Sequence, residues 1–297
     1  MSSRWGPDGK QAAVSFTFDN LGEASDIEFG RWPKDRAIGS HHSALRDLPA
    51  ILDVLDTKVT FFFEAWNLHV YPDAVRAVAE AGHEIGSHGI RHEIWCNLTA
   101  DQELDHLKRC QDDFARHDIE IIGLRPPGGI AAASSAKTLA ELGMTYISPI
   151  GVPAGVLDSG VAVLTVEMAA TDVTFYNADF AKYRHYKPGP EALTPEDMVE
   201  GFMSEVEKTV AAGGFMSAVC HPIYQSPTPE STDPARIEAI GEIVRRITAD
   251  ERIWHASCGE VAAWMRQHEE DFPPPPSLDP PDWWNPSFYK DLKRVGL

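Results

Sequence analysis

The sequence predicts an α/β protein built on a largely parallel β-sheet. Short apolar runs rich in β-branched and aromatic residues alternate with amphipathic helical segments, which is typical of repeated βα units. Some of these runs are apolar at almost every position, as in strands that are buried on both faces. The strands are expected at residues 12–18, 59–63, 119–124, 144–147, 161–166 and 215–220.

Helices are expected between these runs, wherever a capping residue precedes an apolar stripe with helical spacing. Thr99 and Gln102 form a capping box, because their side chains can satisfy free backbone N–H groups of the first helical turn. Ser257 and Glu260 form a second box of the same kind. The expected first residues or caps are Pro72, Thr99, Ser134 or Ser135, Thr194, Asp233 and Ser257.

The composition excludes several classes of partner. The chain has 297 residues, 43% of them hydrophobic, and a formal net charge of -19. This acidic balance argues against nucleic acid or an anionic membrane surface, because both attract Lys and Arg. No stretch approaches the roughly 20 apolar residues of a membrane span. The four cysteines include no C-x-x-C pair, and the first residues contain no apolar segment like that of a secretory signal, so we expect a cytoplasmic, reduced protein.

The composition changes at residues 273–276, four consecutive prolines that neither a helix nor a central strand can contain. We therefore expect a catalytic domain at residues 1–272 and a Pro-rich C-terminal arm at residues 273–297. The aromatic residues of this arm are Trp283, Trp284, Phe288 and Tyr289. Their rings need an apolar surface, either on their own domain or on a second copy of the chain. We favour the second copy, and with it a homo-oligomer held partly by the arm.

Two histidines stand out at the end of a short apolar run. His88 and His92 are four residues apart, so both imidazoles can lie on one side of a helical turn and face a single ion. Neutral imidazole is a common ligand of zinc and its first-row neighbours. The alternative is a pair of partly exposed histidines that bind nothing.

Other polar residues also follow expected strands. Asp19 and Asn20 follow the first strand, Arg125 follows the third and His221 follows the last. In a closed or partly closed parallel barrel, the loops after the strands gather at one end and build the active site. Each residue also has an ordinary structural explanation: a turn cap for Asp19, an ion pair for Arg125 and a loop hydrogen bond for His221. Their joint occurrence at strand ends favours a common pocket.

Together these residues resemble the motif set of the polysaccharide deacetylase family, also called the NodB homology domain. The order and approximate intervals match over about residues 12–265, most of the chain. The matching segments are Thr17-Phe18-Asp19-Asn20, Ser87-His88-Gly89-Ile90-Arg91-His92, Arg125-Pro126-Pro127-Gly128, Asp172 and Val219-Cys220-His221-Pro222. The form of the histidine motif and the lack of a leader resemble most closely the cytoplasmic branch of the family. That branch includes peptidoglycan-deacetylase-like proteins, cyclic imide hydrolases and metal-independent allantoinases.

The resemblance implies a distorted (β/α) barrel, usually of seven strands, with a divalent metal ion in its active site. It implies that Asp19 is the general base and that Arg125 holds this carboxylate. His221 corresponds to the acid that protonates the leaving amine, and Asp172 to the residue that orients His221. The metal ligands correspond to Asn20, His88 and His92. Members of this branch are often symmetric oligomers, which is a further reason to expect one here.

Asn20 departs from the family pattern, which has a metal-binding aspartate at this position. An amide oxygen can ligate a cation but brings no charge, so metal affinity should fall. Three outcomes are open: a weak site with Asn20, a site completed by Asp19 or Glu23, or no metal at all. We favour a metal, because both histidines are retained. Zinc fits two imidazoles and one oxygen with an open position; manganese, cobalt or nickel are the alternatives.

The expected function is the hydrolysis of a non-peptide C–N bond, either in an N-acetyl group or in a cyclic amide or imide. A cytoplasmic protein meets a small-molecule amide, imide or N-acetylated substrate more easily than polymeric cell wall. Two rival hypotheses keep the fold. One is a metal-independent hydrolase of the allantoinase kind. The other is a binding or assembly protein in which Asn20 has disabled catalysis and the C-terminal arm is the functional part.

Overall fold

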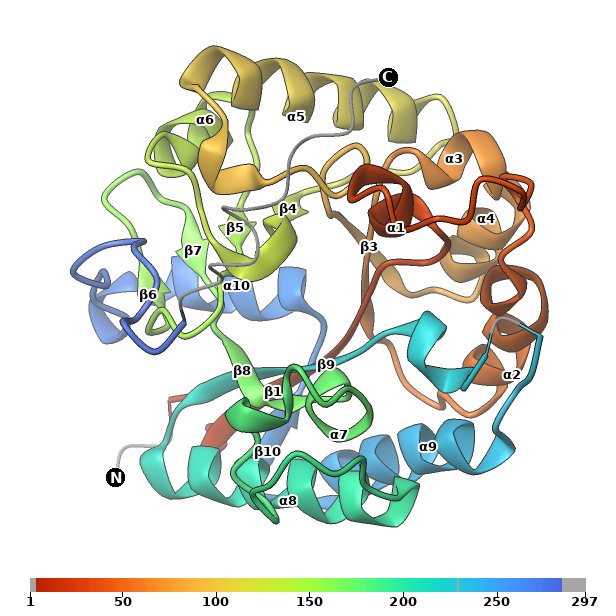
Figure 1. Ribbon diagram of the computed structural model, residues 1–297. Helices are drawn as coiled ribbons and strands as arrows, with labels where there is room; N and C mark the ends of the chain where they lie inside the picture. The colour runs from red at the N-terminus through yellow and green to blue at the C-terminus, as the bar shows by residue number, and fades with distance from the viewer. Residues whose placement is uncertain (1–3, 229, 285–297) are drawn as a thin grey trace.

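The computed structural model describes residues 4–228 and 230–284 of the chain. Its strands are β1 Ala12–Asp19, β2 Thr60–Phe63, β3 Glu84–Ser87, β4 Gly123–Leu124, β5 Tyr146–Ile147, β6 Gly155–Val156, β7 Ala162–Val163, β8 Val166–Thr171, β9 Phe215–Cys220 and β10 Ile253–His255. Its α-helices are α1 Ala24–Glu28, α2 Leu48–Asp53, α3 Asn67–Val70, α4 Pro72–Glu80, α5 Ala100–Ala115, α6 Ser135–Glu141, α7 Val173–Tyr176, α8 Pro195–Ala212, α9 Pro234–Ala249 and α10 Cys258–Gln267. Figure 1 shows the strands at the centre and the helices around them.

The strands belong to one curled sheet. Nine of them follow the order β6-β7-β5-β4-β3-β2-β1-β9-β8, and β10 pairs with β1 beside this path. Every pair is parallel except β6 with β7. An isolated parallel bridge between Ile150 and Val166 links the start of β8 to the chain just after β5. The sheet is therefore curled into an incomplete barrel, in which this bridge connects the chain after β5 to the start of β8. The carboxyl ends of its parallel strands lie on one side.

The α/β class and the curled parallel sheet agree with the prediction, but the sheet has ten strands rather than seven. The prediction of a single strand at residues 161–166 was wrong. Two short strands, β7 and β8, meet in this region: β7 pairs with β5, whereas β8 pairs with β9. The backbone N–H of Leu164 still donates to Ile147, while Thr165 already accepts from Ser217. The chain thus changes its pairing partner between these two residues, which a continuous apolar run does not reveal.

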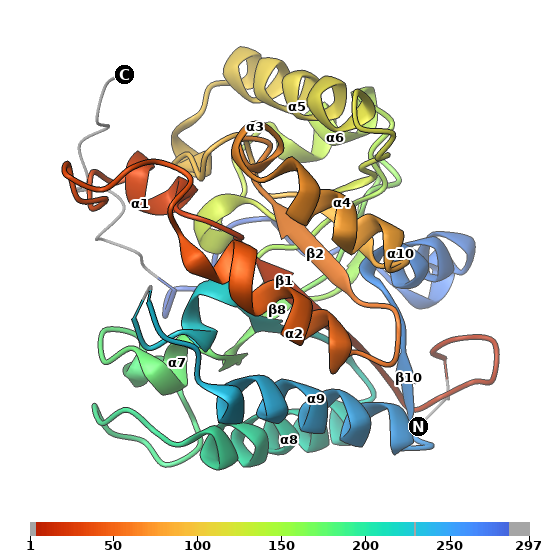
Figure 2. The same cartoon turned by 90° about the vertical axis from the view of Figure 1, so that its right-hand side faces the viewer.

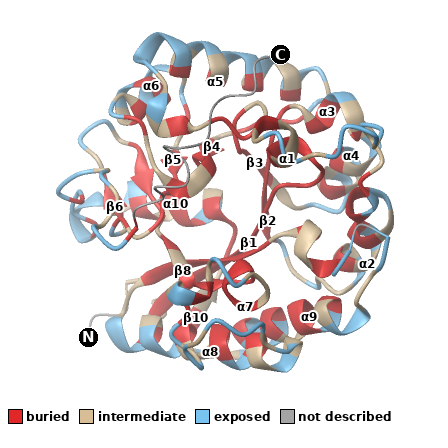
Figure 3. Ribbon diagram, viewed as in Figure 1, coloured by how far each residue is buried: buried red, intermediate tan, exposed pale blue. Residues whose placement is uncertain are grey.

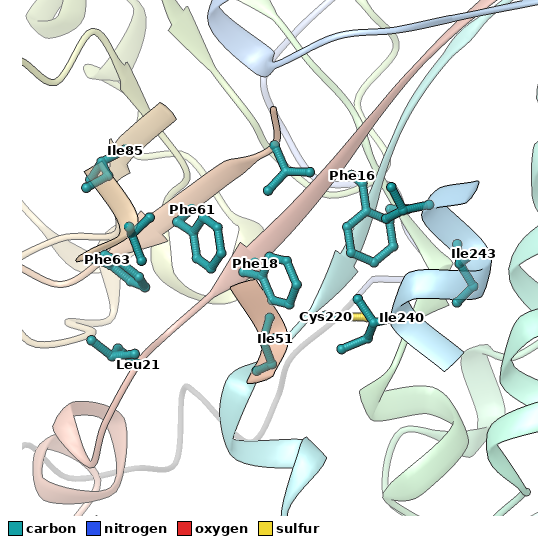
Figure 4. Close-up of a cluster of buried hydrophobic side chains, with 14 of the residues drawn as sticks. Phe16, Phe18, Leu21, Ile51, Phe61, Phe63, Ile85, Cys220, Ile240 and Ile243 are labelled. Carbon is teal, nitrogen blue, oxygen red and sulfur yellow. The ribbon is translucent and has the colours of Figure 1, made fainter. Parts of the chain in front are cut away.

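The alternation of β1 divides the barrel wall into an outer and an inner face. Phe16 and Phe18 lie in the largest apolar cluster, where Phe18 stacks on Phe61 at 4.5 Å between ring centroids. Figure 4 shows this cluster between β1, β2 and the helices that carry Ile51 and Ile240. On the other face of β1, Ser15, Thr17 and Asp19 are polar and buried, and Thr17 and Asp19 contribute to the site described below. β1 thus contributes apolar residues to the core and polar residues to the candidate active site.

The long helices begin as the sequence predicts. Thr99 and Ser257 each form a complete capping box, and Thr194 and Asp233 cap α8 and α9 with their side chains. In Figure 2, α2, α8 and α9 lie along one side of the sheet. Figure 3 shows that the strands and the inner helix faces are buried while the outer helix faces are exposed. In the described part of the chain, no helix combines the length and apolar character needed to cross a membrane.

The described part of the C-terminal arm packs on its own domain, which differs from the expectation that a second copy buries it. The Trp284 side chain is 3% exposed, and its Nε1 donates to the Gly128 carbonyl at 3.0 Å. Trp283 is 51% exposed. The expectation was wrong for Trp284 because the loops at the mouth of the barrel offer an apolar surface that the sequence does not identify. Phe288 and Tyr289 lie outside the described residues.

Candidate active site

A cavity of about 790 Å³ opens at the carboxyl ends of the strands. Six of the seven site residues expected from the sequence line it: Asp19, Asn20, His88, His92, Arg125 and His221. The seventh, Asp172, is fully buried directly behind His221. Parallel strands bring their carboxyl ends to the same edge, which is why residues far apart in the sequence meet here.

Asp19 and Arg125 form a buried ion pair on the floor of the cavity. Arg125 Nη1 donates to Asp19 Oδ1 at 2.6 Å and to Thr17 Oγ1 at 2.7 Å. Its other nitrogens donate to Ser148 Oγ, and its guanidinium lies 4.1 Å from the centroid of the Phe62 ring. The arginine side chain is 2% exposed. These contacts fix the guanidinium, which in turn binds one carboxylate oxygen of Asp19 and leaves the other available to accept a proton.

His221 and Asp172 form a second pair on another wall. His221 Nδ1 donates to Asp172 Oδ1 at 2.7 Å, and the His221 backbone N–H donates to Asp172 Oδ2 at 2.7 Å. Burial alone would lower the pKa of His221, but the Asp172 carboxylate outweighs it, so the pKa is raised above its ordinary value of 6.5. The raised pKa favours the protonated imidazole. Because Nδ1 is bonded to Asp172, Nε2 is the ring nitrogen that can interact with a ligand in the cavity.

His88 and His92 lie in the turn after β3, with ring centroids 4.9 Å apart. The expected helical turn was wrong: the chain leaves β3 in an irregular turn in which Gly89 has φ 78° and His92 φ 69°. The two rings nevertheless meet in the cavity. The turn is held by Glu93, whose carboxylate oxygens accept from the backbone N–H groups of Ile90 and Arg91 at 3.0 Å each.

Both imidazoles are neutral. Burial, aided by the Arg125 charge, lowers the pKa of His88 to about 3, and burial together with His88 lowers that of His92. His88 Nδ1 donates to the Arg125 carbonyl at 2.9 Å, so its Nε2 keeps a free lone pair. A backbone carbonyl bonded to one ring nitrogen is the usual arrangement for a histidine that ligates a metal through the other.

The buried polar atoms of the site fit a cation. Asn20 Oδ1 and His92 Nδ1 are buried, and neither has a hydrogen-bond partner among the described residues. Such atoms are costly to bury unless something binds them. The described residues contain no group of three or more His, Cys, Asp or Glu side chains that could hold a metal ion. Asn20, His88 and His92 include only two side chains of these types, because the third ligand would be an amide oxygen.

Glu23 is engaged elsewhere, so it does not complete this set. Its Oε2 accepts from the Tyr71 hydroxyl at 2.6 Å, and its Oε1 accepts from the Gly39 backbone N–H at 2.5 Å. These bonds anchor the long loop after β1 to the segment before α4. Glu23 therefore stabilises the loop after β1, which forms part of the cavity wall, and does not itself face a metal ion.

Sequence reasoning missed several residues that position the reactive groups. Ser148 and Thr17 hold Arg125, and Gln225 Nε2 donates to Asp172 Oδ2 at 2.9 Å. Ser148 directly follows β5, so the rule that polar residues at strand ends converge could have found it. Thr17 and Gln225 carry no such signal.

The comparisons with known proteins agree with this geometry. Residues 7–147 match the sequence profile of the polysaccharide deacetylase family. A peptidoglycan-N-acetylglucosamine deacetylase of Bacillus cereus is 30% identical over 99 residues, which are 32% of this chain and 46% of that protein. The match thus spans about half the length of that relative.

Solved structures extend the likeness to almost the whole chain. A protein of Mycobacterium smegmatis described as a polysaccharide deacetylase superposes with a TM-score of 0.77 at 25% identity, over 95% of this chain and 98% of that one. An allantoinase superposes with a TM-score of 0.68 at 18% identity, over 91% and 95%. At this lower identity the likeness shows the fold alone.

Fold and cavity define a deacetylase-like α/β barrel with its polar residues at the carboxyl ends of the strands. Residues 7–147 match the polysaccharide deacetylase family, so the resemblance predicted from the motif residues is confirmed.

Proposed function

We propose that the protein hydrolyses a non-peptide C–N bond in a small amide, imide or N-acetylated compound. The observation that carries the proposal is the pairing of a fixed carboxylate with a proton-bearing imidazole at one cavity. Asp19 is held by Arg125 at 2.6 Å, and His221 is held by Asp172 at 2.7 Å. Hydrolysis of an amide needs these two roles, because water must lose a proton and the amine must gain one.

Asp19 acts as the general base. Arg125 binds one of its oxygens, so the other can accept a proton from a water molecule as its oxygen adds to the substrate carbonyl carbon. Thr17 and Ser148 keep the guanidinium in place during this step. The new C–O bond converts the carbonyl into a tetrahedral oxyanion.

His221 acts as the general acid. Its Nε2 proton passes to the substrate nitrogen while the C–N bond breaks and the carbonyl re-forms. An amine leaves poorly unless it is protonated, which explains the value of an imidazole whose pKa is raised by Asp172. An N-acetylated compound gives acetate and an amine, whereas a cyclic imide gives one ring-opened molecule with a carboxylate and an amide. In both cases one water molecule is consumed, and the enzyme recovers its proton balance through solvent.

Asn20, His88 and His92 would hold a divalent metal ion, for which zinc is the best match to two imidazoles and one oxygen. Such an ion would polarise the substrate carbonyl and add positive charge where the oxyanion develops. Its affinity should be lower than with a carboxylate ligand, because the amide of Asn20 is uncharged.

The amide at position 20 also supports a second candidate, a metal-independent hydrolase that uses the same base and acid. In that case the cationic side chains that line the cavity, among them Arg125, would be its positive groups. Both candidates require Asp19 and His221, and they differ in whether His88 and His92 bind a metal.

Elemental analysis of the purified protein, with His88→Ala and His92→Ala variants as controls, separates the two candidates. Turnover is measured on an N-acetylated sugar, a cyclic imide and a cyclic ureide, with Asp19→Asn as the inactive control. Metal that is lost in the histidine variants supports the first candidate. Turnover without metal that Asp19→Asn abolishes supports the second. Absence of turnover on all three classes would contradict both and leave a binding protein of the same fold.

A further inference from the structure

The C-terminal arm reaches the active-site cavity through Trp284. This residue lines the same cavity as Asp19 and His221, although it lies far beyond them in the sequence. Its Nε1 donates to the Gly128 carbonyl at 3.0 Å, in the loop that follows Arg125. Its ring lies 5.0 Å from that of Tyr183, measured between centroids.

The indole is held firmly in this position. The Trp284 backbone N–H donates to the Pro281 carbonyl at 2.8 Å, which closes a tight turn before it. Pro281 and Trp283 pack so closely on Gly151 that a Cβ added there would lie 2.7 Å and 2.8 Å from their side chains. The described part of the arm therefore forms one wall of the cavity.

Trp284 belongs to the apolar part of the cavity lining. It lies in one buried cluster with Ile150, Val166, Met168, Val173 and Val219, all of which also line the cavity. A cavity of about 790 Å³ that joins such a surface to a few polar groups suits a small ligand. A polymer would instead need a groove that lets the chain continue on both sides of the reacting bond.

We infer that Trp284 is a specificity-determining residue that restricts the site to compact amides or imides with an apolar or planar face. The inference rests on the proposed function for its substrate chemistry. A longer chain that extends over Gly128 would have to displace the indole from its hydrogen bond and from Tyr183. Removal of the indole should therefore open the cavity to larger molecules while the base and acid stay in place.

Labelling of a cysteine inside the cavity tests the opening without relying on activity. Met168 lines the cavity and is 4% exposed, whereas Cys96 is the partly exposed native thiol and the other three cysteines are buried. The parent for the test is therefore the Cys96→Ser, Met168→Cys protein. Its labelling rates are measured with N-ethylmaleimide and with the bulkier fluorescein-5-maleimide, alone and combined with Trp284→Ala, Trp284→Leu or Trp283→Ala.

We expect fluorescein-5-maleimide to react much more slowly than N-ethylmaleimide in the parent. Trp284→Ala should raise the ratio of the two rates several-fold, and Trp284→Leu, which keeps an apolar anchor for the arm, should raise it less. Trp283→Ala removes an indole that anchors the arm on Gly151 but does not line the cavity, so it should raise the ratio less than Trp284→Ala does. An unchanged ratio in both Trp284 variants, with the fold retained by circular dichroism, would overturn the inference.

Turnover of N-acetylglucosamine and of its tetramer provides the second arm of the test. Trp284→Ala should raise kcat/KM for the tetramer relative to the monomer, and Trp283→Ala should raise it less. If no protein turns over either sugar, the sugar branch of the proposed function fails while the labelling ratio still decides the role of Trp284. If the unaltered protein prefers the tetramer, the inference itself is wrong.

Discussion

Asp172 accepts two hydrogen bonds from His221, one from ring Nδ1 and one from the backbone N–H, each 2.7 Å long. Gln225 Nε2 adds a third donor to the same carboxylate at 2.9 Å. The carboxylate is fully buried, so its charge acts on the imidazole with little screening by solvent. This pair therefore sets both the orientation of His221 and the pH at which it loses its proton.

Asp172→Asn should shift the alkaline limb of the pH–activity profile to lower pH. The raised pKa keeps His221 protonated, so activity falls as the pH rises through that pKa. Removal of the carboxylate charge lowers the pKa by about one unit or more, so the fall begins at lower pH. Asp179→Asn is the matched control, because Asp179 also lines the cavity, and it should leave the limb in place. A limb that does not move in Asp172→Asn would show that another group sets it.

Asn20→Asp should tighten metal binding by roughly tenfold or more, because ligand charge is a main determinant of affinity for hard and borderline cations. Affinity is measured by titration against a chelator, so the result does not depend on turnover. Asn177→Asp is the control, since it adds the same charge to another residue of the cavity lining. Equal affinity of Asn20→Asp and the unaltered protein would mean that position 20 is not at the ion.

Glu93→Ala should weaken metal binding by roughly tenfold to a hundredfold, as loss of residues that orient metal ligands commonly does. Its two oxygens hold the backbone N–H groups of Ile90 and Arg91, and thereby the turn that presents His92 at φ 69°. Glu93→Gln keeps one good acceptor and should lose less. The readout is again chelator competition, together with the melting temperature of the metal-free protein. Unaltered affinity in Glu93→Ala would show that the turn holds its shape without the carboxylate.

Much of the fold follows from local sequence patterns. β1 alternates apolar and polar residues, and β2 and β9 are largely apolar. The long helices start after residues whose side chains cap the first turn, such as Thr99 and Ser257. Parallel topology then explains the convergence of most of the polar residues, because Asp19 ends a strand and Asn20, His88, Arg125 and His221 directly follow one. His92 lies further along the turn after β3. These features need no knowledge of distant contacts.

The features that could not be predicted depend on contacts between distant segments. The histidine turn is irregular because Glu93 and the backbone N–H groups of Ala65 and Trp66 bind it, and the i, i+4 spacing alone favoured a helix. The position of Trp284 depends on a carbonyl of Gly128, 156 residues away in the chain. Proline and aromatic composition could not distinguish this intramolecular site from a surface on a second copy.

Glu64 should make the protein less stable as the pH rises from 5 to 8. It follows β2, is fully buried, and receives one hydrogen bond from Asn67 Nδ2 at 2.8 Å, while its Oε1 has no partner among the described residues. Burial raises its pKa from the ordinary 4.5 to about 8. Between these values the folded protein binds a proton that the unfolded chain has released, so the free energy of unfolding falls as the pH rises.

Glu64→Gln removes this titration and should therefore gain stability over the unaltered protein as the pH rises. The difference in free energy of unfolding, measured by urea titration of the metal-free proteins, should grow by about 2 to 5 kcal/mol between pH 5 and pH 8. Glu80→Gln, on the exposed face of α4, should differ from the unaltered protein equally at both pH values. Parallel stability curves for Glu64→Gln and the unaltered protein would mean that Glu64 is ionised in the folded state, with a cation or water at its free oxygen.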